Sequence, residues 1–285
     1  MSGSIVAAVD GSEASARALR WASSEARMRA ATLSVVHVME WPMQFAEGLH
    51  SREIREAAAV RAEQLVETAV QTVRTDFPDV EVEGWFDVGH VSGVLVERSQ
   101  QTDLLVIGVP SRHGMGRLLG STAGHLIGHA RCSLAVIPAH QPASPGEVLV
   151  GVDDAPSSKA VLAAAFAEAQ LRGAGVHVLH AYEWPLALGQ DDWVTPLYTA
   201  DGLRETEELL VAEALAGARG DYPDVQVRTT VVNAQAADAL LEAAAEATLV
   251  VVGAQGRGGF LGILIGSVAR TVAYHSPVPT LIVRG

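Results

Sequence analysis

The sequence has a single cysteine, Cys132, among 285 residues. One thiol cannot form an intramolecular disulfide or a cysteine-based metal cluster, and its scarcity fits a reducing cytoplasm. Basic residues are also few, since 20 Lys and Arg stand against 33 Asp and Glu and give a formal net charge of -13. Phosphate backbones and anionic membrane surfaces are bound through Lys and Arg, so neither nucleic acid nor a membrane is an expected partner.

Long apolar runs are missing as well. Glu242 and Glu246 interrupt the stretch 239–252, which is therefore too polar to span a bilayer. The chain leads from Met1 into a strand-like segment at Ser4 without the basic and apolar regions of a signal peptide. Because 49% of the residues are hydrophobic and 19% charged, we expect a folded, soluble, cytoplasmic protein, and its length suggests about two domains.

An internal repeat organises the chain. Five markers return in the same order at a nearly constant offset: 5–10 as 148–153, 40–42 as 183–185, 76–80 as 221–225, 105–108 as 250–253, and 120–121 as 266–267. This period is far longer than that of a solenoid, so each copy should be a whole domain. We predict domains at 1–140 and 146–285, joined by a short Pro-containing linker at about 139–146.

Within each copy, short β-branched runs alternate with longer amphipathic segments. In the first copy we expect strands at 4–9, 33–38, 80–86, 104–107 and 134–138, and helices at 13–30, 52–75, 91–100 and 117–130. Strands that are apolar on both faces and separated by helices indicate a parallel sheet covered on both sides. The predicted fold class is α/β, with two tandem doubly wound, Rossmann-like domains of five parallel strands in the order 3-2-1-4-5. Such sheets bind ligands beyond the carboxyl ends of their strands.

A glycine-rich loop follows the fourth strand of the second copy. Residues 253–262 read GAQGRGGFLG, and a helix is expected to open at Gly266-Ser267. Glycine lets a ligand approach the main chain, and consecutive amides with a helix N-terminus suit a phosphate. Ser267 adds a hydroxyl donor, and Arg257 can cover the charge. A flexible glycine hinge is the alternative.

Two other nucleotide-binding signatures are absent from the sequence. There is no Gly-x-x-x-x-Gly-Lys-Ser/Thr loop, so a Walker-type NTPase is not indicated. No Gly-x-Gly-x-x-Gly follows the first strand, so a dinucleotide Rossmann site is not indicated either.

The spacing Gly253-x2-Gly256-x9-Gly266-Ser267 resembles the nucleotide loop of the universal stress protein family. Segments 9–13 (VDGSE), 37–38 (HV) and 87–89 (DVG) resemble that family's other landmarks, and the resemblance covers both copies. It implies five-stranded domains that bind ATP in some members and not in others. It also implies an intrachain pseudo-dimer of the two domains through their last strands, and a homodimer.

The resemblance places a nucleotide site in each copy. In the second copy the residues are Val152, Asp153, Ala181, Gly253, Gly256, Arg257, Gly258, Gly266, Ser267 and Val268. In the first copy they are Val9, Asp10, Val38, Gly108, Ser111, Gly114, Gly120, Ser121 and Thr122. A carboxylate after strand one can accept ribose hydroxyls or help to place Mg²⁺, and a helix N-cap is the alternative for it.

The copies depart from the family pattern in opposite ways. The first loop is one residue shorter and has Ser111 where the second has Gly256. The second copy keeps its glycines but has Asp154 where the first has Gly11. An added carboxylate opposes a polyphosphate unless metal or solvent screens it. We nevertheless expect the second site to bind nucleotide better.

Several conspicuous residues are assigned other roles. His125 and His129 lie one helical turn apart, but no third ligand is evident, so no metal site made of protein ligands is predicted. The rest are interpreted as hydrogen-bonded His37 and His180, loop-packing Trp41 and Trp184, a buried thiol at Cys132, and a solvated helix face at Glu205, Glu207 and Glu208.

These observations predict an ATP-binding stress-response protein that acts as a nucleotide-dependent regulator or sensor. Phosphoryl transfer needs charge clamps and a group that orients the nucleophile. Near the complete loop the sequence offers only Arg257, Ser267 and Asp153, so we expect no catalytic residues and at most slow hydrolysis. A slow ATP hydrolase and a nucleotide-free interaction scaffold with decayed sites are the alternatives.

Overall fold

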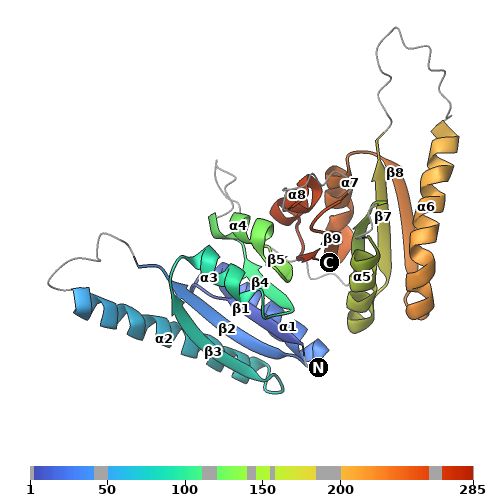
Figure 1. Ribbon diagram of the computed structural model, residues 1–285. Coiled ribbons are helices and arrows are strands. Elements are labelled where there is room, and N and C mark those ends of the chain that lie inside the picture. Colours follow the sequence, from blue (N-terminus) through green and yellow to red (C-terminus); the bar gives the residue numbers. More distant parts are fainter. Residues whose placement is uncertain are drawn as a thin grey trace, which may run out of the picture. The chain divides into compact units, whose positions relative to one another are not determined.

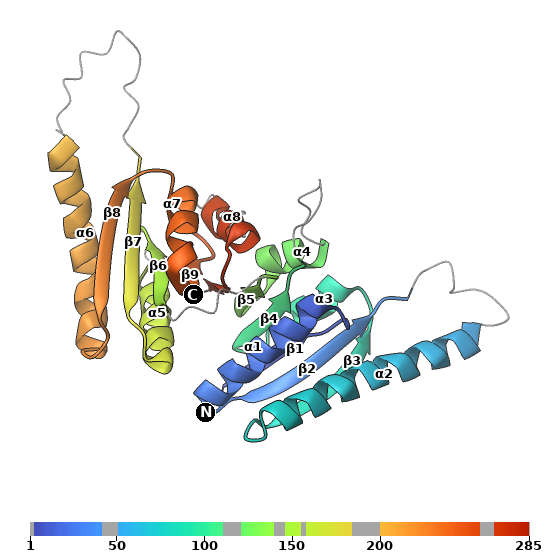
Figure 2. The same cartoon turned by 180° about the vertical axis from the view of Figure 1, so that it is seen from behind.

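The computed structural model describes residues 3–41, 51–110, 121–139, 146–154, 158–183, 200–256 and 265–284. The chain divides into two compact units, unit 1 (Met1–Gln141) and unit 2 (Pro142–Val283). Each unit is a sheet with helices on both faces (Figures 1 and 2). None of the helices within the described ranges has the length and apolar character needed to cross a membrane.

Unit 1 alternates strands and helices along the chain. Its strands are β1 (Ser4–Ala8), β2 (Thr32–Met39), β3 (Val82–Val88), β4 (Leu104–Gly108) and β5 (Ser133–Ile137), and its helices are α1 (Glu13–Arg29), α2 (Ser51–Asp76), α3 (Val91–Arg98) and α4 (Ser121–His129). All neighbours pair in parallel, in the order β3-β2-β1-β4-β5. This confirms the predicted doubly wound order.

Unit 2 repeats this arrangement. Its strands are β6 (Glu147–Val152), β7 (Val176–Tyr182), β8 (Val227–Asn233), β9 (Ala247–Gly253) and β10 (Thr280–Val283), and its helices are α5 (Ser158–Arg172), α6 (Ala200–Asp221), α7 (Ala236–Ala243) and α8 (Ser267–His275), with the short 3₁₀ helix η2 (Ala244–Glu246). The parallel order is β8-β7-β6-β9-β10. In both units the order reverses between strands one and four, where such sheets bind ligands.

The core of each unit lies between the sheet and its helices. In unit 1, α1 and α2 cover one face of the sheet, and α3 and α4 cover the other (Figure 2). Strand β4, which lies between β1 and β5, is buried from Leu104 to Ile107. On α1, the buried residues Ala18, Ala22 and Ala26 follow one another at intervals of four, so a stripe of small side chains faces the strands.

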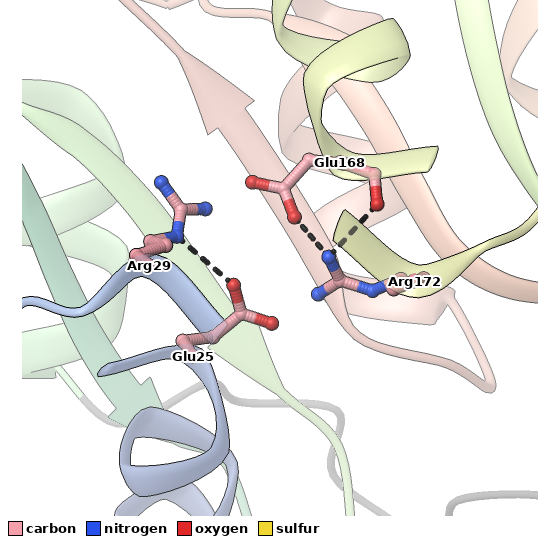
Figure 3. Close-up of polar contacts among 4 residues, drawn as sticks. All are labelled: Glu25, Arg29, Glu168 and Arg172. Carbon is pink, nitrogen blue, oxygen red and sulfur yellow. Dashed lines mark hydrogen bonds and ion pairs between the residues drawn. The ribbon is translucent and has the colours of Figure 1, made fainter. Parts of the chain in front are cut away.

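Buried glutamates recur at the same place in both units (Figure 3). In α1, Glu25 is only 1% exposed and receives a bond from Arg29 Nε at 3.1 Å. In α5, Glu168 is also buried and pairs with Arg172 at the same i, i+4 spacing. Glutamate is rarely buried without a partner, so each arginine is part of what keeps its carboxylate in the core.

The first helix ends differently in the two units. Ala30 caps α1 in the left-handed conformation (φ 49°, ψ 45°), and it is the only described non-glycine residue with a positive φ. Its counterpart after α5 is Gly173, with φ 61°. Glycine adopts this conformation without the steric cost that a Cβ brings. Unit 1 therefore carries backbone strain that unit 2 avoids.

This difference predicts opposite effects of exchanging the two residues. Ala30→Gly should stabilise unit 1 and Gly173→Ala should destabilise unit 2, each by about 1 kcal/mol. A Cβ at Gly173 would meet no atom within 4 Å, so the effect there is confined to the backbone. Urea unfolding with hydrogen exchange, which resolves the two units, measures both changes. Equal stability of wild type and both variants would contradict the assignment of strain.

Candidate functional site

A tight turn follows β1 in unit 1. The Asp10 carboxylate accepts the Ser12 amide at 2.9 Å, and Gly11 between them has φ 80°. Ser12, rather than Asp10, is the N-cap of α1, because its Oγ accepts the Ser15 amide at 3.2 Å. Partial burial by itself raises the pKa of Asp10, but hydrogen bonds from Ser12 and Ser15 outweigh it and hold the pKa below its usual value. Asp10 is thus an ionised, exposed carboxylate at the end of strand one.

The corresponding turn in unit 2 is built around Asp153. Ser158, the first residue of α5, donates its hydroxyl to Asp153 Oδ1 at 2.9 Å and lies 2.8 Å from the Asp153 carbonyl oxygen. Asp154 replaces Gly11 and does not have a positive φ, so the backbone conformation at this position differs between the two units. The carboxylate of Asp153 nevertheless stays at the strand end, as predicted from the repeat.

The structure brings Gly256 against Asp153, although the two residues are 103 positions apart in the sequence. A Cβ at Gly256 would lie 2.5 Å from Asp153 Oδ2. Such a separation is shorter than real Cβ contacts, so only glycine fits while the carboxylate keeps its place. Two residues that the resemblance assigns to one site therefore meet at the mouth of the sheet.

The glycine loop returns to its starting point. The Gly266 amide donates to the Ala254 carbonyl at 2.7 Å, which joins the beginning and the end of the loop. Gly266 is the N-cap of α8 and has no side chain to bond the first amides of that helix. The amides of the first turn, including those of Ser267 and Val268, lack intrahelical acceptors. They form a positive helix end beside Gly256 that suits an anion.

The other loop residues of the prediction fall in two groups. Arg257, Gly258, Ser111, Gly114 and Gly120 lie outside the described residues, as does Trp184. Ser121 and Thr122 open α4. Gly108 is the last residue of β4, and a Cβ there would overlap the Ala14 backbone of α1. Its glycine is therefore required by close packing of helix on strand.

The end of strand two supports strand one in both units. His37 Nδ1 lies 2.8 Å from the Val9 carbonyl oxygen, and His180 Nδ1 lies 2.9 Å from the Val152 carbonyl oxygen, which confirms the predicted structural hydrogen bonds. Val38 lies inside β2. Ala181 was expected to follow strand two but lies inside β7, which extends to Tyr182.

Glu207 is a residue whose role the sequence did not reveal. It was assigned to a solvated face with Glu205 and Glu208, but its side chain is only 13% exposed and its Oε2 lies 2.8 Å from His180 Nε2. The carbonyl at Nδ1 can only accept, so the Nδ1 hydrogen points to Val152. In unit 1 the position corresponding to Glu207 is Ala62.

The remaining conspicuous residues have local partners. The rings of His125 and His129 stack with centroids 4.0 Å apart, and within the described part of the chain no three His, Cys, Asp or Glu side chains group as metal ligands do. Arg55 lies over the Trp41 ring at 5.5 Å. Cys132 is buried as predicted, and burial raises its pKa to about 11.

Two doubly wound α/β domains, each with its candidate site beyond strands one and four, define the class of protein. Residues 1–138 and 146–284 each match the universal stress protein family. A universal stress protein of Mycolicibacterium smegmatis is 35% identical over 299 residues, covering 98% of this chain and 96% of the relative. One from Mycobacterium tuberculosis is 35% identical over 301 residues, covering 98% and 94%.

A solved structure shares the fold of the whole chain. The crystal structure of a universal stress protein from Archaeoglobus fulgidus has a TM-score of 0.75 at 18% identity, and the match covers 100% of this chain and 99% of that one. The chain belongs to the universal stress protein family and carries two of its domains in tandem.

The pairing of Glu207 with His180 predicts a specific loss of stability. Glu207→Ala should destabilise unit 2 by about 1–3 kcal/mol, because the buried imidazole loses a hydrogen-bond partner. Glu205→Ala on the exposed face of the same helix should change stability by less than about 0.5 kcal/mol. Urea unfolding with hydrogen exchange at β7 distinguishes them. Indistinguishable unfolding of the two variants would show that the pair contributes nothing.

The pKa of Cys132 predicts slow alkylation of the native thiol. A rise from 9.0 to about 11 lowers the thiolate fraction near pH 8 by about 100-fold, and only the thiolate reacts. Iodoacetamide should therefore label the folded protein at least about 100-fold more slowly than the urea-unfolded chain, with the rate rising until about pH 11. Equal rates near pH 8 would contradict a buried, neutral thiol.

Proposed function

We propose that this protein is a nucleotide-dependent regulator of the stress response that binds ATP at unit 2. The observation that carries the proposal is the contact of Gly256 with Asp153, where a Cβ would lie 2.5 Å from the carboxylate. This contact brings main-chain amides together with a carboxylate that can accept ribose hydroxyls, at the carboxyl ends of the strands. The resemblance of the loop to the family's nucleotide loop supplies the choice of ATP.

Each part of the site has a proposed task. The Asp153 carboxylate accepts ribose hydroxyls, and the amides of Gly256, Ser267 and Val268 receive phosphate oxygens. Ala181, at the end of β7, offers its main chain to the adenine. Mg²⁺ that accompanies ATP would bind phosphate oxygens and could take Asp153 as a protein ligand, because it prefers oxygen donors.

Binding without rapid turnover is part of the proposal. In-line phosphoryl transfer needs a group that orients the attacking nucleophile. Asp153 already accepts the Ser158 hydroxyl at 2.9 Å, and its other oxygen faces Gly256. These contacts suit a carboxylate that positions a ligand more than one that activates water. The setting we propose is the cytoplasm, with homodimers as the family resemblance implies.

A substitution at Gly256 tests the site. Gly256→Ala should weaken ATP binding by at least about tenfold, because the added methyl group displaces Asp153 or closes the space above it. Gly217→Ala is the matched control, since a Cβ at that exposed helix position of unit 2 meets no atom within 4 Å. Isothermal titration of the full chain with ATP measures both affinities.

Two further readings complete this test. Denaturing the purified protein should release adenine nucleotide, and added ATP should yield little phosphate. Absence of both released nucleotide and ATP binding would overturn the proposal and leave an interaction scaffold. Rapid phosphate release that is lost in Gly256→Ala would instead establish an enzyme.

A further inference from the structure

A pocket of about 340 Å³ lies between α1 and α2 in unit 1. It runs from Val9 and Gly11 near the end of β1 to Phe77 beyond the end of α2. Its size is within the range of small-molecule sites, about 300–1,000 Å³. It lies in the unit whose glycine loop departs from the family pattern, and it follows the two helices away from the strand ends.

The duplicated chain shows which side chain this space lacks. Unit 2 has Phe166 on α5, fully buried, with its ring centroid 5.7 Å from that of Tyr222. The alignment that pairs Glu25 with Glu168 places Ser23 at the position of Phe166, and Ser23 forms part of the pocket. A phenyl group that fills the space between the two helices in unit 2 is thus missing in unit 1.

Neighbouring residues compensate for this loss only in part. Val73 stands where unit 2 has Ala218, so two methyl groups are added on α2 while a whole ring is lost on α1. The ring of Phe77, the counterpart of Tyr222, lies instead beneath the Arg27 guanidinium at 5.2 Å. Ser23 itself is buried and donates its hydroxyl to the Leu19 carbonyl at 2.8 Å. The hydroxyl donor at this side of the pocket therefore already has an acceptor.

The lining sets the chemistry of an occupant. Leu19, Leu65, Val73 and Phe77 offer hydrocarbon walls. The charged lining residues are one arginine, Arg20, and one aspartate, Asp76, whose charges cancel. A neutral molecule therefore complements the pocket, because a charged one would lose hydration without a net opposite charge to replace it. Because the space corresponds to a missing phenyl group, an aromatic ring matches the shape of the pocket.

We propose that unit 1 binds a small, neutral aromatic molecule between α1 and α2, in the space that Phe166 fills in unit 2. Burial of apolar ring surface drives the binding. The pocket reaches Gly11, where a Cβ would lie 3.3 Å from Leu65, so an occupant also contacts the turn that holds Asp10. The proposal does not depend on ATP binding at unit 2.

Benzyl alcohol is the probe for the test, with benzoate and benzylamine as charged analogues of similar size. Titration of the ¹⁵N-labelled full chain should shift amide signals of α1 and α2 and leave those of α5 and α6 in place. Ser23→Phe should weaken the binding of benzyl alcohol by at least about tenfold, because the added ring fills the pocket. Gln71→Phe, which adds the same ring on α2 outside the pocket lining, should bind as wild type does.

A second variant and the charged analogues keep the proposal open to contradiction. If Ser23→Phe fails to fold, Ala69→Leu fills the pocket from the α2 side and should weaken binding in the same direction. Tighter binding of either charged analogue would overturn the neutral assignment. Absence of localised shifts in the wild type up to the solubility limit of benzyl alcohol would overturn the site, as would unchanged affinity in the filled variants.

Discussion

The candidate site depends on the close approach of the Gly256 main chain to the Asp153 carboxylate. β6 and β9 are neighbours on either side of the reversal in strand order, so the segments that leave them diverge and open a mouth. At that mouth no side chain fits at position 256 while Asp153 stays in place. The Gly266–Ala254 hydrogen bond then brings the start of α8 back to the same point. Without these contacts the loop would be only a hinge.

The two units keep their scaffold and differ in what surrounds it. Strand order, the buried Glu–Arg pairs and the left-handed helix end are common to both. Two differences lie where helices face each other or the sheet: Ser23 against Phe166, and Ala62 against Glu207. Such positions can change without altering strand pairing, because they fill the space between layers. Phe166 is fully buried in unit 2, whereas unit 1 has a pocket at the corresponding place between α1 and α2.

Much of the fold could be predicted from the sequence, because parallel strands buried on both faces leave apolar runs that the intervening helices separate. The strand order predicted with the doubly wound fold class is confirmed. Partners across the fold could not be predicted. Glu207 belongs to a run of acidic residues, and only tertiary contact shows that it turns inward to His180. Likewise, the sequence does not reveal that a Cβ at Gly108 would overlap the backbone of α1.

The same geometry explains why we favour a sensor over an enzyme. Rapid phosphoryl transfer requires groups free to clamp charge as it develops. At unit 2 the Asp153 carboxylate is instead held by Ser158, and the strand end is held by His180, which Glu207 in turn fixes. Because these hydrogen bonds fix the strand end and the carboxylate, we expect ligand binding to move them little. In the proposed function, a signal would then depend on the segment between Ala254 and Gly266, whose two ends are joined by a hydrogen bond.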